Sequence, residues 1–153
     1  MKGSPGSSRP PAGYEPVEHT ADIGLRVWAP SVEGLFTQAA LGLFSFLVDV
    51  EHVRVREARR IDLEAADIEE ALVAWLQELL YLFDVQRFVP AGIDVEAVTP
   101  KEVHAVVRGE PLDRRRHEIR MEIKAATYHG LDIRPIPAEN GTSRWECTII
   151  FDT

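Results

Sequence analysis

The stretch SVEGLFTQAALGLFSFLV, from Ser31 to Val48, decides the fold. Its apolar residues recur at the i, i+3, i+4 spacing of a helix with one wide apolar face. Ser31 is suited to cap the first turn, and the negative charge of Glu33 suits the positive end of the helix dipole. Burial of each large apolar side chain contributes about 1.5–3 kcal/mol, so we expect this helix to anchor the core.

The flanking segments predict a strand before this helix and a second helix after it. From Ile23 to Val27 every second residue is aliphatic, and Pro30 ends this strand. Asp67 and Glu70 resemble a capping box at the start of the second helix. The apolar face of that helix extends from Ile68 to Phe83.

The other expected strands are short apolar or β-branched segments bounded by turn residues. They comprise residues 59–63, 87–89, 93–98, 103–107, 117–128 and 145–151. Turns or loops are expected at residues 90–92, 99–101, 109–113 and 134–143. Because helices come early and a run of strands comes late, we expect an α+β fold in which two helices pack on a largely antiparallel β-sheet.

Length and composition indicate one domain, expected at residues 14–153, since 153 residues can bury a substantial core. Residues 1–13 are rich in Gly, Ser and Pro, which predicts a disordered tail and not a secretory signal. The longest apolar run is shorter than the roughly 20 residues that cross a bilayer. A single cysteine, Cys147, excludes an internal disulfide, and we expect a cytoplasmic protein.

The formal net charge of −8 argues against tight, autonomous binding of RNA or DNA, which relies on Lys and Arg. The densest positive stretch is Arg114–Arg116. Most such charge runs are solvated surface, and that is the favoured interpretation here. Contact with phosphate groups or with an acidic protein surface is the alternative.

Asp22 and Asp152 are candidate metal ligands, because each lies at one end of an apolar strand. Two carboxylates brought together repel unless a cation or a proton neutralises one of them. Their oxygen atoms suit Ca²⁺, Mg²⁺ or Mn²⁺, and the α-carboxylate or carbonyl of Thr153 could add another ligand. Spacing alone favours two solvated aspartates, because a large separation along the chain says nothing about proximity.

His19, His129 and Lys124 are further candidates for a site. Imidazole titrates near neutral pH, but no HExxH or CxxC spacing supports zinc, so a structural role is the simpler interpretation of each histidine. Lys124 could contact a phosphate or pair with an acidic neighbour. The sequence contains no GxSxG, P-loop or GxGxxG motif, and a metal-dependent hydrolase that uses Asp22 and the two histidines is the least favoured alternative.

Three stretches together resemble the archease family. They are HTADIG (His19–Gly24) with the helix that follows it, KAATYHGLDI (Lys124–Ile133) and IIFDT (Ile149–Thr153). The resemblance covers about Glu15 to Thr153 and implies an archease-like α+β sandwich. It also implies a protein cofactor that activates an RtcB-type RNA ligase, by promoting GTP-dependent guanylylation and multiple turnover in tRNA splicing and RNA repair. No catalytic residue and no enzymatic activity of its own are expected.

The resemblance further implies a divalent-cation site at Asp22, Asp152 and Thr153, with Ca²⁺ expected and Mg²⁺ or Mn²⁺ as alternatives. His19, Lys124 and His129 match motif positions and are expected to support this site or to contact the partner. RNA would be reached only through the ligase, and no membrane contact is expected. The alternative function is a chaperone or modulator of RNA-modifying enzymes that needs no metal.

Overall fold

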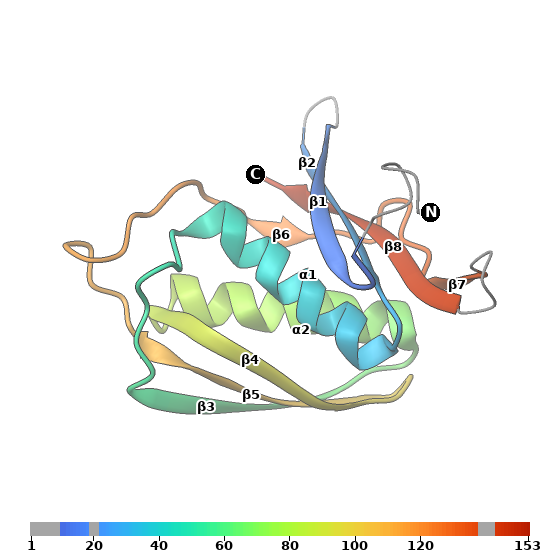
Figure 1. The fold of residues 1–153 in the computed structure, drawn as a ribbon, viewed down its shortest axis with the longest axis horizontal. Coiled ribbons are helices and arrows are strands. Elements are labelled where there is room, and N and C mark those ends of the chain that lie inside the picture. Colours follow the sequence, from blue (N-terminus) through green and yellow to red (C-terminus); the bar gives the residue numbers. More distant parts are fainter. Residues whose placement is uncertain (1–9, 19–21, 138–142) are drawn as a thin grey trace, which may run out of the picture.

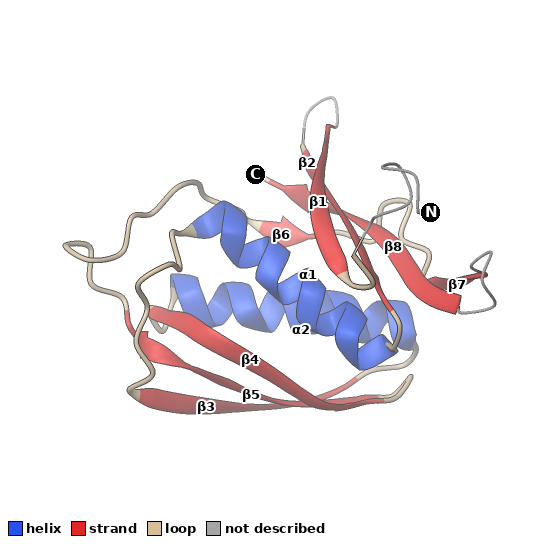
Figure 2. Ribbon diagram, in the orientation of Figure 1, coloured by secondary structure: helices blue, strands red, loops and turns tan. Residues whose placement is uncertain are grey.

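Two helices lie between two antiparallel sheets in the computed structural model, which describes residues 10–18, 22–137 and 143–153 (Figure 1, Figure 2). The helices are α1 (Val32–Leu47) and α2 (Ile68–Asp84). The strands are β1 (Gly13–Glu18), β2 (Ile23–Ala29), β3 (Glu57–Glu64), β4 (Phe88–Val98), β5 (Glu102–Pro111), β6 (Ala125–Ala126), β7 (Arg134–Pro137) and β8 (Ser143–Asp152). The predicted α+β class, with two helices packed on antiparallel strands, is confirmed.

One sheet has five strands and joins the two ends of the described chain. Its order is β1-β2-β8-β6, and β7 also pairs with β8. The other sheet has three strands in the order β3-β5-β4. Strand β2 pairs with β8 in the register Ile23↔Phe151 to Ala29↔Trp145, so an early and a late segment of the sequence are adjacent in the fold.

Helix α1 begins as the sequence predicts, because the Ser31 hydroxyl accepts a hydrogen bond from the Gly34 backbone N–H at 3.0 Å. The helix lies close to β2. A Cβ at Gly42 would be only 2.5 Å from Cδ2 of the fully buried Leu25, so this position requires a residue without a side chain. Close approach of helix and strand therefore depends on Gly42.

Helix α2 begins at the predicted cap, where the Asp67 carboxylate accepts a hydrogen bond from the Glu70 N–H at 2.8 Å. It packs on α1 through buried groups. The indole N–H of Trp75 donates to the carbonyl oxygen of Phe36 at 3.0 Å. The rings of Phe44 and Phe83 meet edge to face, with centroids 6.1 Å apart. The core is thus shared by both helices and both sheets.

Strand boundaries differ from the predictions where pairing depends on distant residues. The turn predicted at 90–92 is wrong, because β4 continues through it with a bulge between Pro90 and Gly92. Pro90 lacks the N–H that would continue the ladder, and the paired Gly109 leaves no room for a Cβ beside the Val89 carbonyl. The turn predicted at 109–113 is displaced, since β5 extends to Pro111.

The long strand predicted at 117–128 is also wrong. Only Ala125–Ala126 pairs as a strand there, together with one isolated bridge between Val48 and Ile119. Conversely, the loop predicted at 134–143 begins with strand β7. Strand β1 has no counterpart among the predicted strands, because Pro16 and its polar neighbours gave no apolar pattern.

The predicted tail falls partly inside the described chain. Residues 1–9 lie outside the described residues, but residues 10–13 do not behave as a free tail. Gly13 begins β1, and the carbonyl oxygen of Pro10 accepts a hydrogen bond from the indole N–H of Trp28 at 2.8 Å. Within the described part of the chain, neither helix has the length and apolar character needed to cross a bilayer.

Candidate functional site

The start of β2, the end of β8 and the start of β6 come together at one end of the five-stranded sheet, which we call its polar edge. Ile23 and Phe151 form the last pair of the β2–β8 ladder, Asp22 directly precedes Ile23, and Asp152 directly follows Phe151. The register therefore brings the two aspartates to the same end of this ladder, which their spacing in the sequence could not establish.

The two aspartates differ in exposure. Asp22 is half-buried and Asp152 is exposed. The next two pairs of the ladder, Gly24 with Ile150 and Leu25 with Ile149, are buried, so the polar residues lie only at the end of these strands.

Strand β6 extends this edge beyond β8. The backbone N–H of Lys124 donates to the Asp152 carbonyl oxygen at 2.7 Å, and Ala125 pairs with Asp152 in the ladder. Thr127 binds the Ile150 carbonyl oxygen twice, with its N–H at 3.0 Å and its hydroxyl at 2.9 Å. These main-chain contacts bring the predicted residue Lys124, whose side chain is exposed, next to Asp152.

The strand β6 is fixed from the helix side by a residue that sequence reasoning missed. The side-chain carbonyl of Gln77 in α2 accepts a hydrogen bond from the Ala126 N–H at 2.8 Å. Gln77 thereby provides the acceptor for the backbone N–H of Ala126, in the short strand next to Asp152. Its polar side chain on a helix surface carries no signal by which the sequence could have identified this role.

The other predicted site residues are Thr153, His129 and His19. Thr153 directly follows Asp152 and is exposed. His129 is exposed in the turn after β6, where its N–H donates to the Thr127 hydroxyl at 3.3 Å and Gly130 adopts a φ of 64°. His19 lies outside the described residues.

The chemistry of the described donors suits a hard cation. Asp22 and Asp152 offer carboxylate oxygens, and Thr153 offers backbone oxygen, which are ligands that Ca²⁺, Mg²⁺ and Mn²⁺ accept. Across residues 10–18, 22–137 and 143–153, no three His, Cys, Asp or Glu side chains are grouped so that they could hold a metal ion by themselves. A cation here would therefore need further ligands from outside this set.

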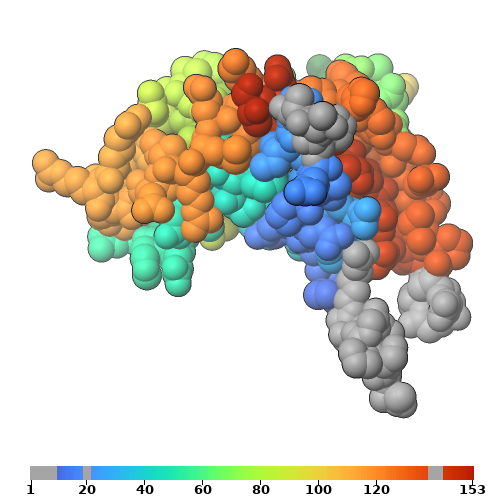
Figure 3. Space-filling view, turned by 90° about the horizontal axis from the view of Figure 1, so that it is seen from above, coloured from blue at the N-terminus to red at the C-terminus, as the bar shows by residue number. Residues whose placement is uncertain are grey.

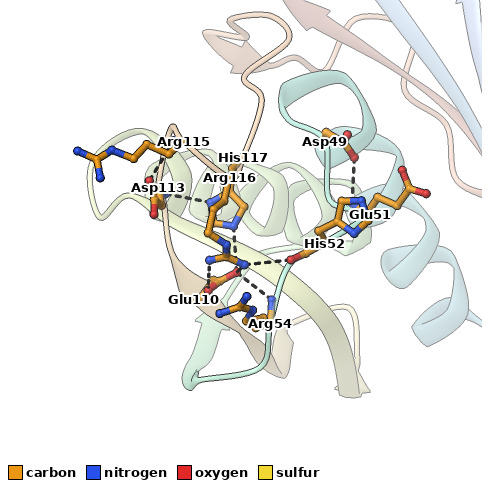
Figure 4. A network of polar contacts seen from close by, with 9 residues as sticks. All are labelled: Asp49, Glu51, His52, Arg54, Glu110, Asp113, Arg115, Arg116 and His117. Atoms are coloured by element: carbon orange, nitrogen blue, oxygen red, sulfur yellow. Dashed lines mark hydrogen bonds and ion pairs between the residues drawn. The ribbon is translucent and has the colours of Figure 1, made fainter.

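A second polar cluster lies at the end of the three-stranded sheet opposite the turn at 99–101 (Figure 4). The sequence analysis noted the arginine run 114–116 but did not predict this cluster. Glu110 in β5 is 1% exposed, and its two carboxylate oxygens accept hydrogen bonds from the Arg116 guanidinium at 2.8 and 2.9 Å. The Arg54 backbone N–H and His117 Nε2 contact the same carboxylate, each at 2.9 Å. Hydrogen bonds from Arg116 are the main cause that lowers the pKa of Glu110.

The contacts of His117 assign its tautomer. Its Nδ1 accepts a hydrogen bond from the Asp113 N–H at 2.9 Å, so that nitrogen carries no proton. Nε2 must then carry the proton and donate to Glu110. His117 is 1% exposed and is a neutral structural histidine in this arrangement. Together with Arg116 it fixes the segment between β5 and β6.

Cys147 is buried in β8. Burial is the main cause that raises the pKa of its thiol to about 12, with smaller contributions from Glu146, Glu69 and Asp132. A thiol that remains protonated at neutral pH is a poor nucleophile. The structure therefore offers no support for a cysteine nucleophile.

Comparison with known proteins gives consistent matches. The model of the Archease protein family matches residues 14–153. Protein archease of Thermococcus gammatolerans is 37% identical over 142 residues, which are 91% of this chain and 97% of that protein. Protein archease of Methanopyrus kandleri is 34% identical, over 91% of this chain and 98% of that protein.

A solved structure has the same fold. The solution structure of Methanobacterium thermoautotrophicum protein 1598 matches with a TM-score of 0.70 and 29% sequence identity. The match covers 92% of this chain and 99% of the other. The family model spans strands β2 and β8 along with nearly all the rest of the chain, and the relatives cover about nine tenths of it. This chain belongs to the archease family.

Proposed function

We propose that this protein is a cofactor of an RtcB-type RNA ligase, which promotes GTP-dependent guanylylation of the ligase and its multiple turnover in tRNA splicing and RNA repair. Membership of the archease family carries the proposal. The register that brings Asp22 and Asp152 to the same end of the β2–β8 ladder supports it, because it provides a polar edge that a partner can reach. The chain is an accessory activator in this proposal, and no residue has a catalytic role.

We further propose that Asp22, Asp152 and Thr153 hold a divalent cation, with Ca²⁺ expected and Mg²⁺ or Mn²⁺ as alternatives. Bound there, a cation would neutralise the two carboxylates and supply positive charge to the phosphates of a nucleotide. The chain itself holds the two carboxylates on paired strand ends. Two carboxylates and a backbone oxygen leave room for water or for oxygen atoms of a partner.

The exposed side chains of Lys124 and His129 are assigned to partner contact at the same edge, and His19 is assigned to this role from the family motif. Lys124 is held next to Asp152 through its backbone, which leaves its side chain able to contact a phosphate or a carboxylate of the ligase. RNA is reached through the ligase in this proposal. A cytoplasmic location stays a prediction.

The direct test combines the purified chain with an RtcB-type ligase, GTP and Mn²⁺. We expect a larger guanylylated fraction of the ligase and more joined RNA per ligase molecule than with an unrelated acidic protein of similar size. No increase over that control would contradict the proposal. Protection of several unrelated RNA-modifying enzymes, unaffected by a chelator, would favour the alternative of a chaperone or modulator.

The cation site is tested separately by thermal unfolding with and without Ca²⁺. A ligand present at a hundred times its dissociation constant stabilises the folded state by about 2.7 kcal/mol, so we expect Ca²⁺ to raise the Tm of the natural chain. Asp152→Asn should abolish the shift. Asp94→Asn, at an exposed aspartate of the other sheet, should retain it. Equal shifts in both variants would place Ca²⁺ elsewhere.

A further inference from the structure

Helix α2 contacts strand β6 and the turn that follows it through two of its side chains. The side-chain carbonyl of Gln77 accepts a hydrogen bond from the Ala126 N–H at 2.8 Å. The Glu69 carboxylate accepts one from the Ile133 N–H at 3.1 Å. One helix thus provides an acceptor for a backbone donor at each end of residues 126–133. We call these two hydrogen bonds the α2 clamp.

The two acceptors lie at a fixed separation along the helix. Residues 69 and 77 have the i, i+8 spacing of one helix face, which corresponds to about 12 Å along the axis. Between the two clamped donors the chain turns back on itself. The Leu131 N–H donates to the Tyr128 carbonyl oxygen at 3.0 Å, and Gly130 adopts a φ of 64°. The clamp therefore sets the span of a compact turn.

The same segment is bound to β8 as well. Thr127 donates to the Ile150 carbonyl oxygen through both its N–H and its hydroxyl, and the Lys124 N–H donates to the Asp152 carbonyl oxygen. In Figure 3 the orange segment that includes β6 lies against the dark red end of β8. Because β6 pairs with β8 over two residues, its ladder is short, and the side chains of α2 supplement it.

The clamped turn and the strand before it carry exposed side chains. Lys124 precedes the clamp, and Tyr128 and His129 lie in the turn that it spans. Tyr128 is 55% exposed, although its ring is large and mostly apolar. Tyrosine is one of the residue types that are enriched among the strongest contacts of protein interfaces. The segment thus presents three side chains that a partner protein can contact.

Order in the free chain decides how strongly such side chains bind. A segment that must be ordered during association lowers the affinity, because the ordering costs free energy. If only a fraction of the molecules has the competent conformation, the apparent dissociation constant rises by the inverse of that fraction. The α2 clamp binds donors at both ends of residues 126–133 in the free chain. It therefore favours one arrangement of the turn before a partner arrives.

We propose that Gln77 and Glu69 are positioning residues for the ligase. Through the α2 clamp they hold Tyr128 and His129 in the arrangement that contacts it. This inference deepens the proposed function and rests on it, since the partner concerned is the RtcB-type ligase. Gln77 and Glu69 act through the backbone of the clamped turn and need not touch the ligase. They set how tightly the chain binds, and not the guanylylation that is reached once it is bound.

Matched substitutions at each residue either remove the acceptor or keep it. Gln77→Met and Glu69→Met remove it at similar side-chain length, whereas Gln77→Glu and Glu69→Gln keep an oxygen that can accept. Glu69→Met and Glu69→Gln remove the same negative charge, so their comparison isolates the hydrogen bond. Gln38→Met makes the same chemical change on helix α1 and is the control. The Tm of each variant is measured first, and every assay is run well below the lowest value.

The first measurement is amide hydrogen exchange of the chain alone, followed by NMR. We expect faster exchange of the Ala126 N–H in Gln77→Met and of the Ile133 N–H in Glu69→Met, because each loses its acceptor. Gln77→Glu and Glu69→Gln should exchange nearly as the natural chain does. Unchanged exchange at both amides in the methionine variants would overturn the clamp without any reference to the ligase.

The second measurement is the concentration of this chain that gives half-maximal guanylylation of an RtcB-type ligase with GTP and Mn²⁺. We expect each methionine variant to raise it about two- to tenfold, the effect of one hydrogen bond, with the same guanylylation at saturation. Gln77→Glu, Glu69→Gln and Gln38→Met should stay within about twofold of the natural chain. A merely structural role would lower the Tm without moving the half-maximal concentration, since nearly all molecules are folded in the assay.

The outcomes separate this inference from the proposed function. Stimulation by the natural chain, with an unchanged half-maximal concentration for both methionine variants, would overturn the positioning role alone. Equal changes in Glu69→Met and Glu69→Gln would assign the effect to charge and overturn the role of Glu69. No stimulation by the natural chain would contradict the proposed function, and the positioning role would be overturned with it.

Discussion

Two residues on β5, the central strand of the three-stranded sheet, couple this fold to pH. Glu110 is an ionised carboxylate in a buried position, and it is tolerated because Arg116, His117 and the Arg54 N–H all donate to it. A buried charge with satisfied hydrogen bonds is costly to disturb, because removal of one partner leaves the others unpaired. The three segments that meet at Glu110 therefore depend on its charge.

Replacement of Glu110 by glutamine should destabilise the protein most at neutral pH. The pKa of Glu110 is lowered below its ordinary value of 4.5, mainly by hydrogen bonds from Arg116. Its contribution to stability is therefore present above pH 4.5 and is lost as the pH falls through the lowered value. Thermal unfolding from pH 7 to pH 2 should show a difference in Tm between the natural chain and Glu110→Gln that shrinks toward acid.

The exposed glutamate of the same loop provides the control for this prediction. Glu118→Gln removes one carboxylate from the same loop without touching the hydrogen bonds to Glu110, so the loss at Glu110→Gln is measured against it. A constant Tm difference for Glu110→Gln down to pH 2 would show that the charge of Glu110 does not stabilise the fold.

His104 should give the opposite dependence on pH. Its Nδ1 and Nε2 lie 2.7 Å from carboxylate oxygens of Asp62 and Glu102, an arrangement that needs a proton on both nitrogens. The hydrogen bond to Asp62, and then the one to Glu102, raises its pKa above 6.5. The stabilisation is complete below pH 6.5 and is lost as the pH rises through the raised value.

The measurement is the Tm difference between the natural chain and His104→Gln from pH 5 to pH 9, which should decrease toward alkali. An NMR titration of the His104 ring should give a pKa above 6.5. The exposed His52 provides a control variant, His52→Gln, which removes an imidazole without touching the contacts of His104 with Asp62 and Glu102. A pKa of His104 at or below 6.5 would contradict the arrangement.

At the scale of elements, the contact of α1 with β2 depends on a position without a side chain. Gly42→Ala would gain up to about 1 kcal/mol in helix propensity. The new Cβ, however, would be 2.5 Å from Cδ2 of Leu25, which is fully buried and cannot move aside. Because overpacking costs about 1–3 kcal/mol, we expect a net loss of about 1 kcal/mol in the free energy of unfolding.

Urea denaturation measures this loss directly. Gly92→Ala is the matched control, because a Cβ at Gly92 would have no atom within 4 Å and its effect should be under about 0.5 kcal/mol. A Gly42→Ala protein more stable than the natural chain would show that α1 and β2 are not packed as closely as described.

The elements also show what a sequence can predict. Both helices begin at their predicted caps, Ser31 and Asp67, because capping and helical periodicity involve residues only a few positions apart. Strand β1 could not be predicted, and of the strand predicted at 117–128 only β6 forms, because both depend on pairing with β2 and β8 rather than on a pattern of their own. A bulge at Pro90 cannot be told from a turn by composition alone.

At the scale of the whole molecule, the pairing of β2 with β8 brings opposite ends of the sequence to one edge. The sequence could identify Asp22 and Asp152 as strand-end carboxylates. The resemblance to the archease family could assign both of them to one cation site. That they lie at the same end of one strand pair follows only from the register Ile23↔Phe151, which is a non-local property. The polar supports at Gln77 and Glu110 could not be predicted, since each acts on residues distant in the chain.

The measurement that tests the central claim most directly is the rate of ligase guanylylation in the presence of variants of this edge. Asp22→Ala and Asp152→Ala are compared with the natural chain and with Asp94→Ala, which removes the same charge from the other sheet. All four proteins are first checked for the same fold by circular dichroism. We predict that Asp94→Ala stimulates the ligase fully and that the two edge variants lose stimulation at least about tenfold, which corresponds to about 1.4 kcal/mol. Full stimulation by both Asp22→Ala and Asp152→Ala would contradict the account.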